Sequence, residues 1–281
     1  MASAHVRYGL YLPPFGPLAD PAVLLDLARR AEAAGWDGVF LWEHVLSDGP
    51  GPVTDPWVNL GAMAAATSRV RLGTMVTPLP RRRPWVVARQ AATVSRLSGG
   101  RCVLGVGLGA DEYGDFSRFG ETASPRTRAA MTDEALAIVR ASWAGQALDH
   151  AGDHYRVRLE PAEPEPYPIP IWAAGTLPEV RALPRAAGCD GIVLLKPDRH
   201  PLPADVARTV AALRARDVAA DRPFDVAVAG NASPAWEEPS GIDLDGLAEA
   251  GMTWWLETLI HYDPLELSLR VVDAGPPRGR G

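Results

Sequence analysis

The chain has 281 residues, 47% of them hydrophobic, which is enough apolar sequence to bury one large core. Its formal net charge at pH 7 is −6, and no basic stretch carries interleaved aromatic residues, so we expect no nucleic-acid partner. No apolar stretch reaches the roughly 18 residues that a membrane span needs, and the start of the chain lacks a signal-peptide pattern. We therefore expect a cytoplasmic protein with no membrane partner.

One pattern recurs along the chain: an Ala-rich helical segment, a Gly suited to a left-handed cap, and then a short apolar strand. The glycines are Gly35, Gly99, Gly188 and Gly251. Continuous apolar runs such as VLGV and GIVLL are typical of strands buried on both faces, as in a parallel sheet.

The segments between these copies complete a set of alternating strands and helices. Pro21, Pro56 and Pro84 each stand where a first helical residue is expected. Eight parallel strands with helices between them predict an α/β fold, a single closed (β/α)8 TIM barrel. We expect the strands near residues 6–12, 38–42, 70–76, 102–107, 169–173, 191–195, 224–229 and 253–257.

Two segments interrupt this alternation. Residues 108–124 form a loop after the fourth strand that is long enough to be functional, and residues 145–168 end in the extended run PAEPEPYP. We expect one domain over residues 1–273 with insertions at these two places, and a disordered tail over 274–281.

The loops that follow the strands carry the chemistry of a TIM barrel. His44 follows the second strand, where an imidazole can exchange a proton at neutral pH or simply bind a loop carbonyl. Glu43 either orients it or points outward, and we favour the outward position. Cys102 and Cys189 lie in or beside apolar runs and predict buried thiols. No spacing typical of metal ligands occurs, so we expect no metal.

Two glycine-containing strand ends are candidates for binding an anion. The run GVGLGAD, from Gly105 to Asp111, either cradles a phosphate or allows close strand packing beneath a flat ligand. Ala173 to Thr176, followed by Pro178, reads as a strand end, a turn and a helix start, where a phosphate binds well. An ordinary turn with a Thr cap is the alternative.

Several tryptophans stand near strand ends. They either line an apolar pocket for a planar ring or fill the barrel. These residues are Trp42, Trp172, Trp254 and Trp255.

The chain resembles the bacterial luciferase-like monooxygenase superfamily, in particular its branch of oxidoreductases that use coenzyme F420. The resemblance runs from about residue 6 to residue 196. It rests on AEAAGWDGVFLWEHV, on DPWVNLGAMAAATSRVRLGTMVTPLPRRRPWVVARQAATVSRLSGGRCVLGVGLG, on EALAIVRASW and on PIPIWAAGT.

The resemblance implies a homodimeric barrel that binds F420, or alternatively FMN, with its ring across the barrel mouth. It implies that His44 is catalytic and that a non-prolyl cis bond at Met75-Val76 backs the ring. Together with the strand ends, it places the cofactor on Met75, Val76, Gly107, Leu108, Ala173, Ala174, Gly175 and Thr176. The substrate pocket is expected at Phe15, Trp42 and Lys196.

The chain also departs from the family pattern. Gly175-Thr176 replaces a frequent Gly-Gly, Asp111-Glu112-Tyr113 replaces a usual Gly-Trp, and the part after residue 200 matches poorly. The expected function is hydride transfer between F420 and a small organic molecule, with His44 exchanging the proton. The alternatives are an FMN-dependent monooxygenase that uses dioxygen, and a cofactor-free barrel that serves as a binding or structural subunit.

Overall fold

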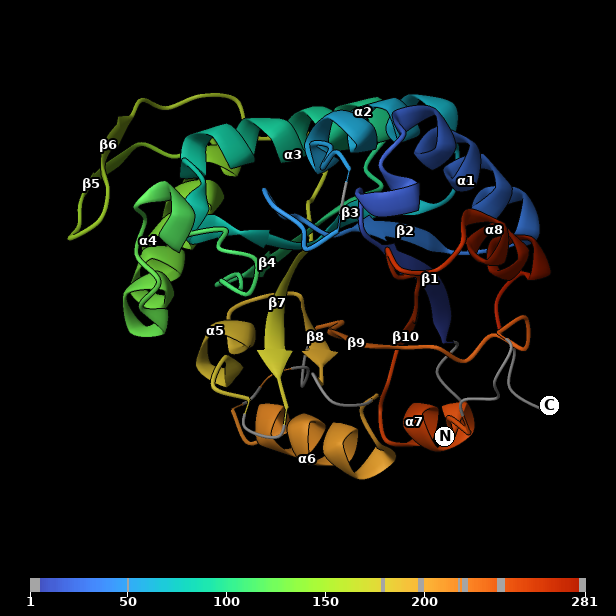
Figure 1. Cartoon of the computed structure of the whole chain (residues 1–281). Helices are drawn as coiled ribbons and strands as arrows, with labels where there is room; N and C mark the ends of the chain where they lie inside the picture. The colour runs from blue at the N-terminus through green and yellow to red at the C-terminus, as the bar shows by residue number, and fades with distance from the viewer. Residues whose placement is uncertain are drawn as a thin grey trace.

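The computed structural model describes residues 6–49, 51–177, 180–196, 200–216, 218, 222–236 and 241–277. Eight parallel strands close a barrel in the order β1-β10-β9-β8-β7-β4-β3-β2, with helices around it (Figure 1). This confirms the predicted α/β TIM barrel and each of its eight strands. The barrel strands are β1 (Arg7–Leu12), β2 (Gly38–Leu41), β3 (Arg71–Pro78), β4 (Cys102–Gly107), β7 (Ile171–Thr176), β8 (Gly191–Leu195), β9 (Asp225–Gly230) and β10 (Trp254–Thr258).

The helices begin where the sequence predicts. Pro21, Pro56 and Pro84 are the first residues of α1, α2 and α3, because a proline loses no helical hydrogen bond there. Gly35 and Gly99 are left-handed caps, as predicted. Gly188 has φ −87°, so the prediction of a left-handed cap at this position was wrong. The helices are α1 (Pro21–Ala34), α2 (Pro56–Ala66), α3 (Pro84–Ser98), α4 (Pro125–Trp143), α5 (Leu183–Ala187), α6 (Pro203–Arg214), α7 (Leu244–Glu249) and α8 (Leu265–Ala274), with short 3-10 turns η1 (Gly16–Leu18), η2 (Leu79–Arg81) and η3 (Ser117–Phe119).

The inside of the barrel is filled by large side chains. Phe40, Trp172 and Trp254 are fully buried there, and the two indole rings lie 5.4 Å apart, centroid to centroid. Trp255 is also fully buried. Barrel filling is therefore the role of Trp172 and Trp254, whereas Trp255 belongs to the core cluster that contains helix residues. Of the four tryptophans near strand ends, only Trp42 lines the main cavity.

The second insertion contains an antiparallel hairpin that the sequence did not predict, formed by β5 (Leu148–Ala151) and β6 (Arg156–Leu159). It projects past α4, away from the barrel (Figure 1). Glu134 of α4 holds it, 3.0 Å from Nε2 of His150 and 3.2 Å from the backbone nitrogen of Tyr155. The tail also differs from the prediction over residues 274–277. Ala274 ends α8 and Gly275 is buried, while residues 278–281 lie outside the described part.

A carboxylate on α1 ties that helix to the segment that leads into β3. Glu32 accepts hydrogen bonds from the backbone nitrogens of Ser68 (3.0 Å), Arg69 (2.6 Å) and Val70 (3.0 Å). Partial burial by itself would raise the pKa of Glu32, but these hydrogen bonds outweigh it and lower the pKa to about 2. The carboxylate therefore stabilises the fold above its unfolded pKa of about 4.3, and this is lost as the pH falls through about 2.

Glu32→Gln is expected to lower the free energy of unfolding by about 1 kcal/mol at pH 7, because hydrogen bonds to a charged acceptor are stronger than those to an amide. Urea denaturation from pH 7 to pH 2 should show this difference shrinking below about pH 5. Glu163→Gln, an exposed change in the proline-rich run, serves as the control and should show no difference at any pH. A gap that stays constant with pH would contradict the prediction.

Candidate active site

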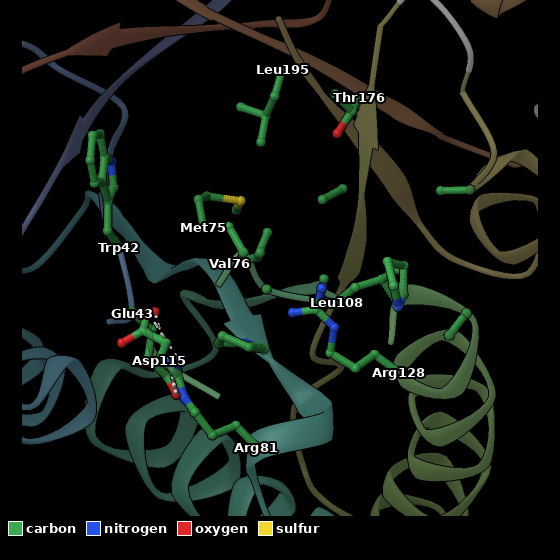
Figure 2. A pocket seen from close by; sticks show the side chains of 18 of the residues that line it. Trp42, Glu43, Met75, Val76, Arg81, Leu108, Asp115, Arg128, Thr176 and Leu195 are labelled. Atoms are coloured by element: carbon green, nitrogen blue, oxygen red, sulfur yellow. Dashed lines mark hydrogen bonds and ion pairs between the residues drawn. The ribbon is translucent and has the colours of Figure 1, made fainter. Parts of the chain in front are cut away.

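A cavity of about 960 Å³ opens at the carboxyl ends of the barrel strands. This size suits a tricyclic cofactor together with a small substrate. Figure 2 shows Met75 and Val76 near its centre, with Trp42 on one side and Arg128 reaching in from another.

The floor of the cavity lies where β3 meets β4. The peptide bond between Met75 and Val76 is cis, as the resemblance implied, and the pairing of β3 with β4 shifts register there. A Cβ atom on Gly107 would lie 2.5 Å from Cγ2 of Val76, and one on Gly105 would lie 2.1 Å from the carbonyl oxygen of Thr74. The glycines of this run therefore permit close strand packing, and they keep the floor free of longer side chains.

His44 lines the cavity and is held by a buried carboxylate. Its Nδ1 lies 2.6 Å from Oδ2 of Asp115, which is 1% exposed. Oδ1 of Asp115 accepts hydrogen bonds from the backbone nitrogens of Val45 and Leu46, both at 2.9 Å. Arg81 Nη1 lies 3.2 Å from Oδ2 of the same carboxylate.

The electrostatics of this pair fix which ring nitrogen is available. Burial alone would raise the pKa of Asp115, but hydrogen bonds from His44, Leu46 and Val45 lower it to about 2. The ionised carboxylate can only accept, so Nδ1 carries the proton that they share. Nε2 is then the atom at which the ring takes up or releases a proton in the cavity.

Glu43 does not point outward, which corrects the sequence-based expectation. It is 5% exposed and accepts hydrogen bonds from Thr77 Oγ1 (2.8 Å) and Trp57 Nε1 (3.2 Å). Its Oε1 lies 3.6 Å from Arg82 Nε and 3.9 Å from Arg81 Nη2. Burial raises the pKa of Glu43, and Arg82, Thr77 and Arg81 oppose this rise. The outward position is excluded because the side chain is buried between Trp57 of α2 and Thr77 of β3.

A basic wall lies on the α4 and α5 side of the cavity, formed by Arg126, Arg128, Arg181 and Arg185. Arg128 is 6% exposed, and its Nε and Nη1 atoms are buried without a hydrogen-bond partner. Its guanidinium carbon lies 4.4 Å from the centre of the Phe116 ring. Burying a cation without hydrogen-bond partners costs free energy unless an anion pairs with it. This geometry is therefore suited to a phosphate.

The structure brings together most of the residues that the sequence assigned to the site. The cavity is lined by Trp42, His44, Met75, Val76, Gly107, Leu108, Ala174 and Thr176. Ala173 and Gly175 are buried beside it but do not line it, because strand side chains alternate between faces. The helix expected to open at Pro178 cannot be compared, since residues 178 and 179 lie outside the described part. The next helix, α5, begins only at Leu183.

Phe15 and Lys196 also do not line the cavity. Phe15 is fully buried and packs edge-on against His44, with ring centres 5.8 Å apart, so it supports that ring from behind. The ammonium of Lys196 lies 2.7 Å from Oδ2 of Asp205, and its side chain is 6% exposed. The strong ion pair holds Lys196 against α6, away from the mouth of the cavity.

Asp115, Arg81 and Arg128 are site residues that the sequence reasoning missed. Asp115 stands in the loop over residues 108–124, for which a function was expected. Arg128 follows the spacing of the buried positions Thr132 and Ala135 on α4, so a cation on an apolar stripe was a usable signal. Arg81 lies in η2, directly after the floor strand, and had no comparable signal.

Among the described residues, no group of three or more His, Cys, Asp or Glu side chains is arranged to hold a metal ion. Cys102 and Cys189 are free and buried, as predicted. No helix in the described ranges is long and apolar enough to cross a membrane.

Fold and cavity together define a (β/α)8-barrel protein with a site large enough for a flavin-like ring. The chain belongs to the luciferase-like monooxygenase family, whose sequence pattern matches residues 2–240. The resemblance that the sequence motifs indicated is thereby confirmed at the level of the family.

Curated relatives include F420-dependent glucose-6-phosphate dehydrogenases. The one from Beutenbergia cavernae is 36% identical over 179 residues, covering 62% of this chain and 52% of the relative. The one from Kineococcus radiotolerans is 36% identical over 184 residues, with the same coverage of both chains. This chain therefore spans about half the length of the curated relatives that it matches.

Solved structures share the fold over nearly the whole chain. An F420-dependent secondary alcohol dehydrogenase in complex with an F420-acetone adduct has a TM-score of 0.75 at 19% identity, covering 97% of this chain and 98% of that one. A type II Baeyer-Villiger monooxygenase from Pseudomonas putida, in complex with FMN, has a TM-score of 0.72 at 16% identity, covering 96% and 97%. At these identities the comparison establishes the common barrel.

Proposed function

We propose that this protein is an oxidoreductase that transfers a hydride between coenzyme F420 and a small organic molecule, with His44 exchanging the accompanying proton. The observation that carries the proposal is the His44–Asp115 pair on the wall of a cofactor-sized cavity. The relatives named as F420-dependent, at 36% identity, support F420 over FMN.

The residues of the cavity fit such a cofactor. When bound, F420 supplies a ring carbon that accepts or releases a hydride. Met75 and Val76 offer an apolar floor for a flat ring, and Gly107 leaves that floor open. Arg128 and the Thr176 hydroxyl are available to a phosphate, and the first turn of α4 adds a favourable helix dipole.

The substrate is expected on the aromatic side of the cavity. Tyr11 and Trp42 line it there, with ring centres 5.1 Å apart, and Leu195 adds an apolar surface. Burial raises the pKa of Tyr11, so its hydroxyl stays protonated and can donate a hydrogen bond. We place the proton-exchanging Nε2 of His44 next to this region, because Phe15 packs against both His44 and Trp42.

The test is equilibrium titration of the purified protein with oxidised F420 and, separately, with FMN. Tight binding of F420, followed by F420-dependent turnover in a panel that includes secondary alcohols and glucose 6-phosphate, is the expected result. Binding of FMN alone would assign the cavity to flavin-dependent monooxygenation instead. Binding of neither compound would overturn the enzyme proposal and favour a cofactor-free barrel.

Asp115 is proposed as a positioning residue for His44. In Asp115→Asn, the amide oxygen is expected to keep the hydrogen bonds from Val45 and Leu46, which turns the amide NH2 toward Nδ1 and moves the ring proton to Nε2. We expect kcat to fall about tenfold or more, with KM changed less than about threefold. Nitrogen-15 NMR of the His44 ring should show the exchanged tautomer.

Glu112→Gln is the matched control for Asp115→Asn, because Glu112 is exposed in the same loop. It should leave kcat and the His44 ring spectrum unchanged. If Asp115→Asn lowers kcat without any change of tautomer, the positioning role is wrong.

We propose a homodimer that buries the outer faces of α2 and α3, which lie side by side (Figure 1). Helix α2 has no charged residue, and Val58 on its outer face is 73% exposed. On α3, Val86 and Leu97 are 43% and 54% exposed. An uncharged helix such as α2, with exposed apolar side chains on its outer face and on the neighbouring helix, is typical of a surface that another chain covers.

Val58→Asp is expected to weaken self-association by about 2 kcal/mol or more, because it buries an unpaired carboxylate. Light scattering coupled to size exclusion should detect monomers at concentrations where the wild type is dimeric. Ala211→Asp, on the outer side of α6, should remain dimeric. A wild type that is monomeric at all concentrations would contradict the dimer.

We also propose one domain, which extends beyond residue 273 to include the end of α8 and the buried Gly275, and a cytoplasmic location. The pairing of β1 with β10 supports the first proposal, since it joins the two ends of the sequence in one barrel. The two free buried thiols support the second.

A further inference from the structure

A second cavity, of about 310 Å³, lies outside the barrel mouth between η2, the loop before α4 and the turn of the β5–β6 hairpin. We propose that it binds a small organic anion, a phosphate or a carboxylate, and that its occupancy is linked to the active site through Arg81. The residues that carry the proposal are Arg81, Arg82, Arg83, His154 and Tyr155.

The Tyr155 hydroxyl is the first observation. Tyr155 is 4% exposed, lines this cavity, and its hydroxyl is buried without a hydrogen-bond partner. A buried hydroxyl that lacks a partner is costly, so such groups are normally satisfied by a ligand or by water. Burial raises the pKa of Tyr155, so the hydroxyl is protonated at neutral pH and serves as a donor. A donor at this position favours an acceptor ligand.

The charge of the cavity wall points to an anion. Arg83 lines the cavity with an exposed side chain, and its guanidinium takes part in none of the ion pairs found among the described residues. It is the N-cap of α3 and makes no capping hydrogen bond with its side chain, so the positive end of that helix dipole adds to its charge. His154 can contribute a further donor. Glu121 also lines the cavity and partly opposes this charge.

The apolar part of the wall limits the size and kind of ligand. Pro80, Phe116 and Met131 form this part. A volume of about 310 Å³ is at the small end of ligand pockets. An anionic head on a short carbon chain fits both the donors and the apolar surface.

Arg81 and Arg82 connect the two cavities. Both line the second cavity, yet Arg81 is paired with Asp115 at 3.2 Å and Arg82 with Glu43 at 3.6 Å, and both of these acids line the first cavity. An anion that attracts Arg81 competes with Asp115, and Asp115 holds Nδ1 of His44. Occupancy of the second cavity would therefore loosen the group that orients His44, a consequence that rests on the proposed function.

The binding test uses isothermal titration calorimetry with inorganic phosphate, glycerol 3-phosphate and glutarate as probes. The titrations are made on Arg128→Gln, so that the buried guanidinium of the first cavity does not contribute, and they do not depend on F420. We expect one site per chain, with affinity reduced about tenfold or more by adding Arg83→Gln and about threefold by adding Tyr155→Phe. A preference between glycerol 3-phosphate and glutarate identifies which anion the site takes.

Arg214→Gln is the matched control, since Arg214 is exposed at the end of α6 and lines neither cavity. It should bind the probes as the parent does. No binding of any probe, or equal affinity for Arg83→Gln and Arg214→Gln, would overturn the site. The coupling to the active site is tested with the probe that binds most tightly, which should change kcat of the wild type but not of Arg83→Gln. Binding without any change in kcat would overturn the link while leaving the site.

Discussion

Replacing His44 by alanine is expected to lower kcat about 10²- to 10⁴-fold, the range that a positioned general acid or base contributes. The reason is that Nε2 is the nitrogen left free by the short contact between Nδ1 and Asp115, and we propose that it exchanges the proton in the cavity. The affinity for F420 should change less than about threefold, because we assign the phosphate to Arg128 and the ring to Met75 and Val76. Stopped-flow reduction of F420 and equilibrium titration measure the two quantities separately.

His44→Asn sharpens this test. Its amide nitrogen can still donate to Asp115 but cannot take up a proton, so the loop stays anchored while the chemistry is lost. We expect a loss of kcat like that of alanine, with a melting temperature close to that of the wild type. His150→Ala, which removes the imidazole from the outlying hairpin, is the control and should leave kcat unchanged. Wild-type turnover in either His44 variant would remove His44 from the mechanism.

The barrel was predictable because its signals are local. An apolar run such as GIVLL must be buried on both faces, and a proline such as Pro56 is compatible only with the first turn of a helix. Both constraints act within a few residues, so they can be read without knowledge of distant partners. The β5–β6 hairpin lacks such a signal. Its strands are short, polar and half-exposed, and Glu134 on another element holds them in place.

The site was predictable only in part, because several of its contacts join residues that are far apart in the sequence. The positions of His44, Met75 and Val76 follow from strand ends and from the family motifs. The partner of His44 is 71 residues away, and nothing in the loop distinguishes Asp115 from Asp111 before the chain is folded. Glu43 was placed outward because alternation in a four-residue strand does not determine how the next residues turn. Lys196 was expected in the substrate pocket, but its ion pair with Asp205 on α6 could not be inferred from the sequence.

Arg128 shows how a candidate binding group can be identified from the free-energy cost of burying it without partners. Two of its nitrogens are buried without partners, and burial lowers its pKa, with Asp111 partly offsetting the shift. A protein selected for stability alone would place an apolar or paired residue here. The burial of this guanidinium is explained if an anion pairs with it during function, because binding sites are often less stable than the rest of a protein.

Arg128→Gln is therefore expected to act in opposite directions on binding and on stability. The affinity for F420 should fall about 10- to 100-fold, the effect of losing a charge-assisted hydrogen bond to a phosphate. The unliganded protein should be as stable as the wild type or up to about 1 kcal/mol more stable, because a buried unpaired charge is removed. Fluorescence titration and urea denaturation measure the two effects.

A phosphate-free deazaflavin, which keeps the ring system of F420 and lacks its charged tail, shows whether Arg128 contacts the phosphate or the ring. If Arg128 binds the phosphate, Arg128→Gln should weaken F420 while leaving the affinity for the phosphate-free compound within about twofold of the wild type. Arg214→Gln, which changes an exposed arginine outside the cavity, should alter neither affinity. An equal loss for both compounds would mean that Arg128 acts on the ring or on the shape of the cavity, and the basic wall would then have to bind the tail through Arg126, Arg181 or Arg185.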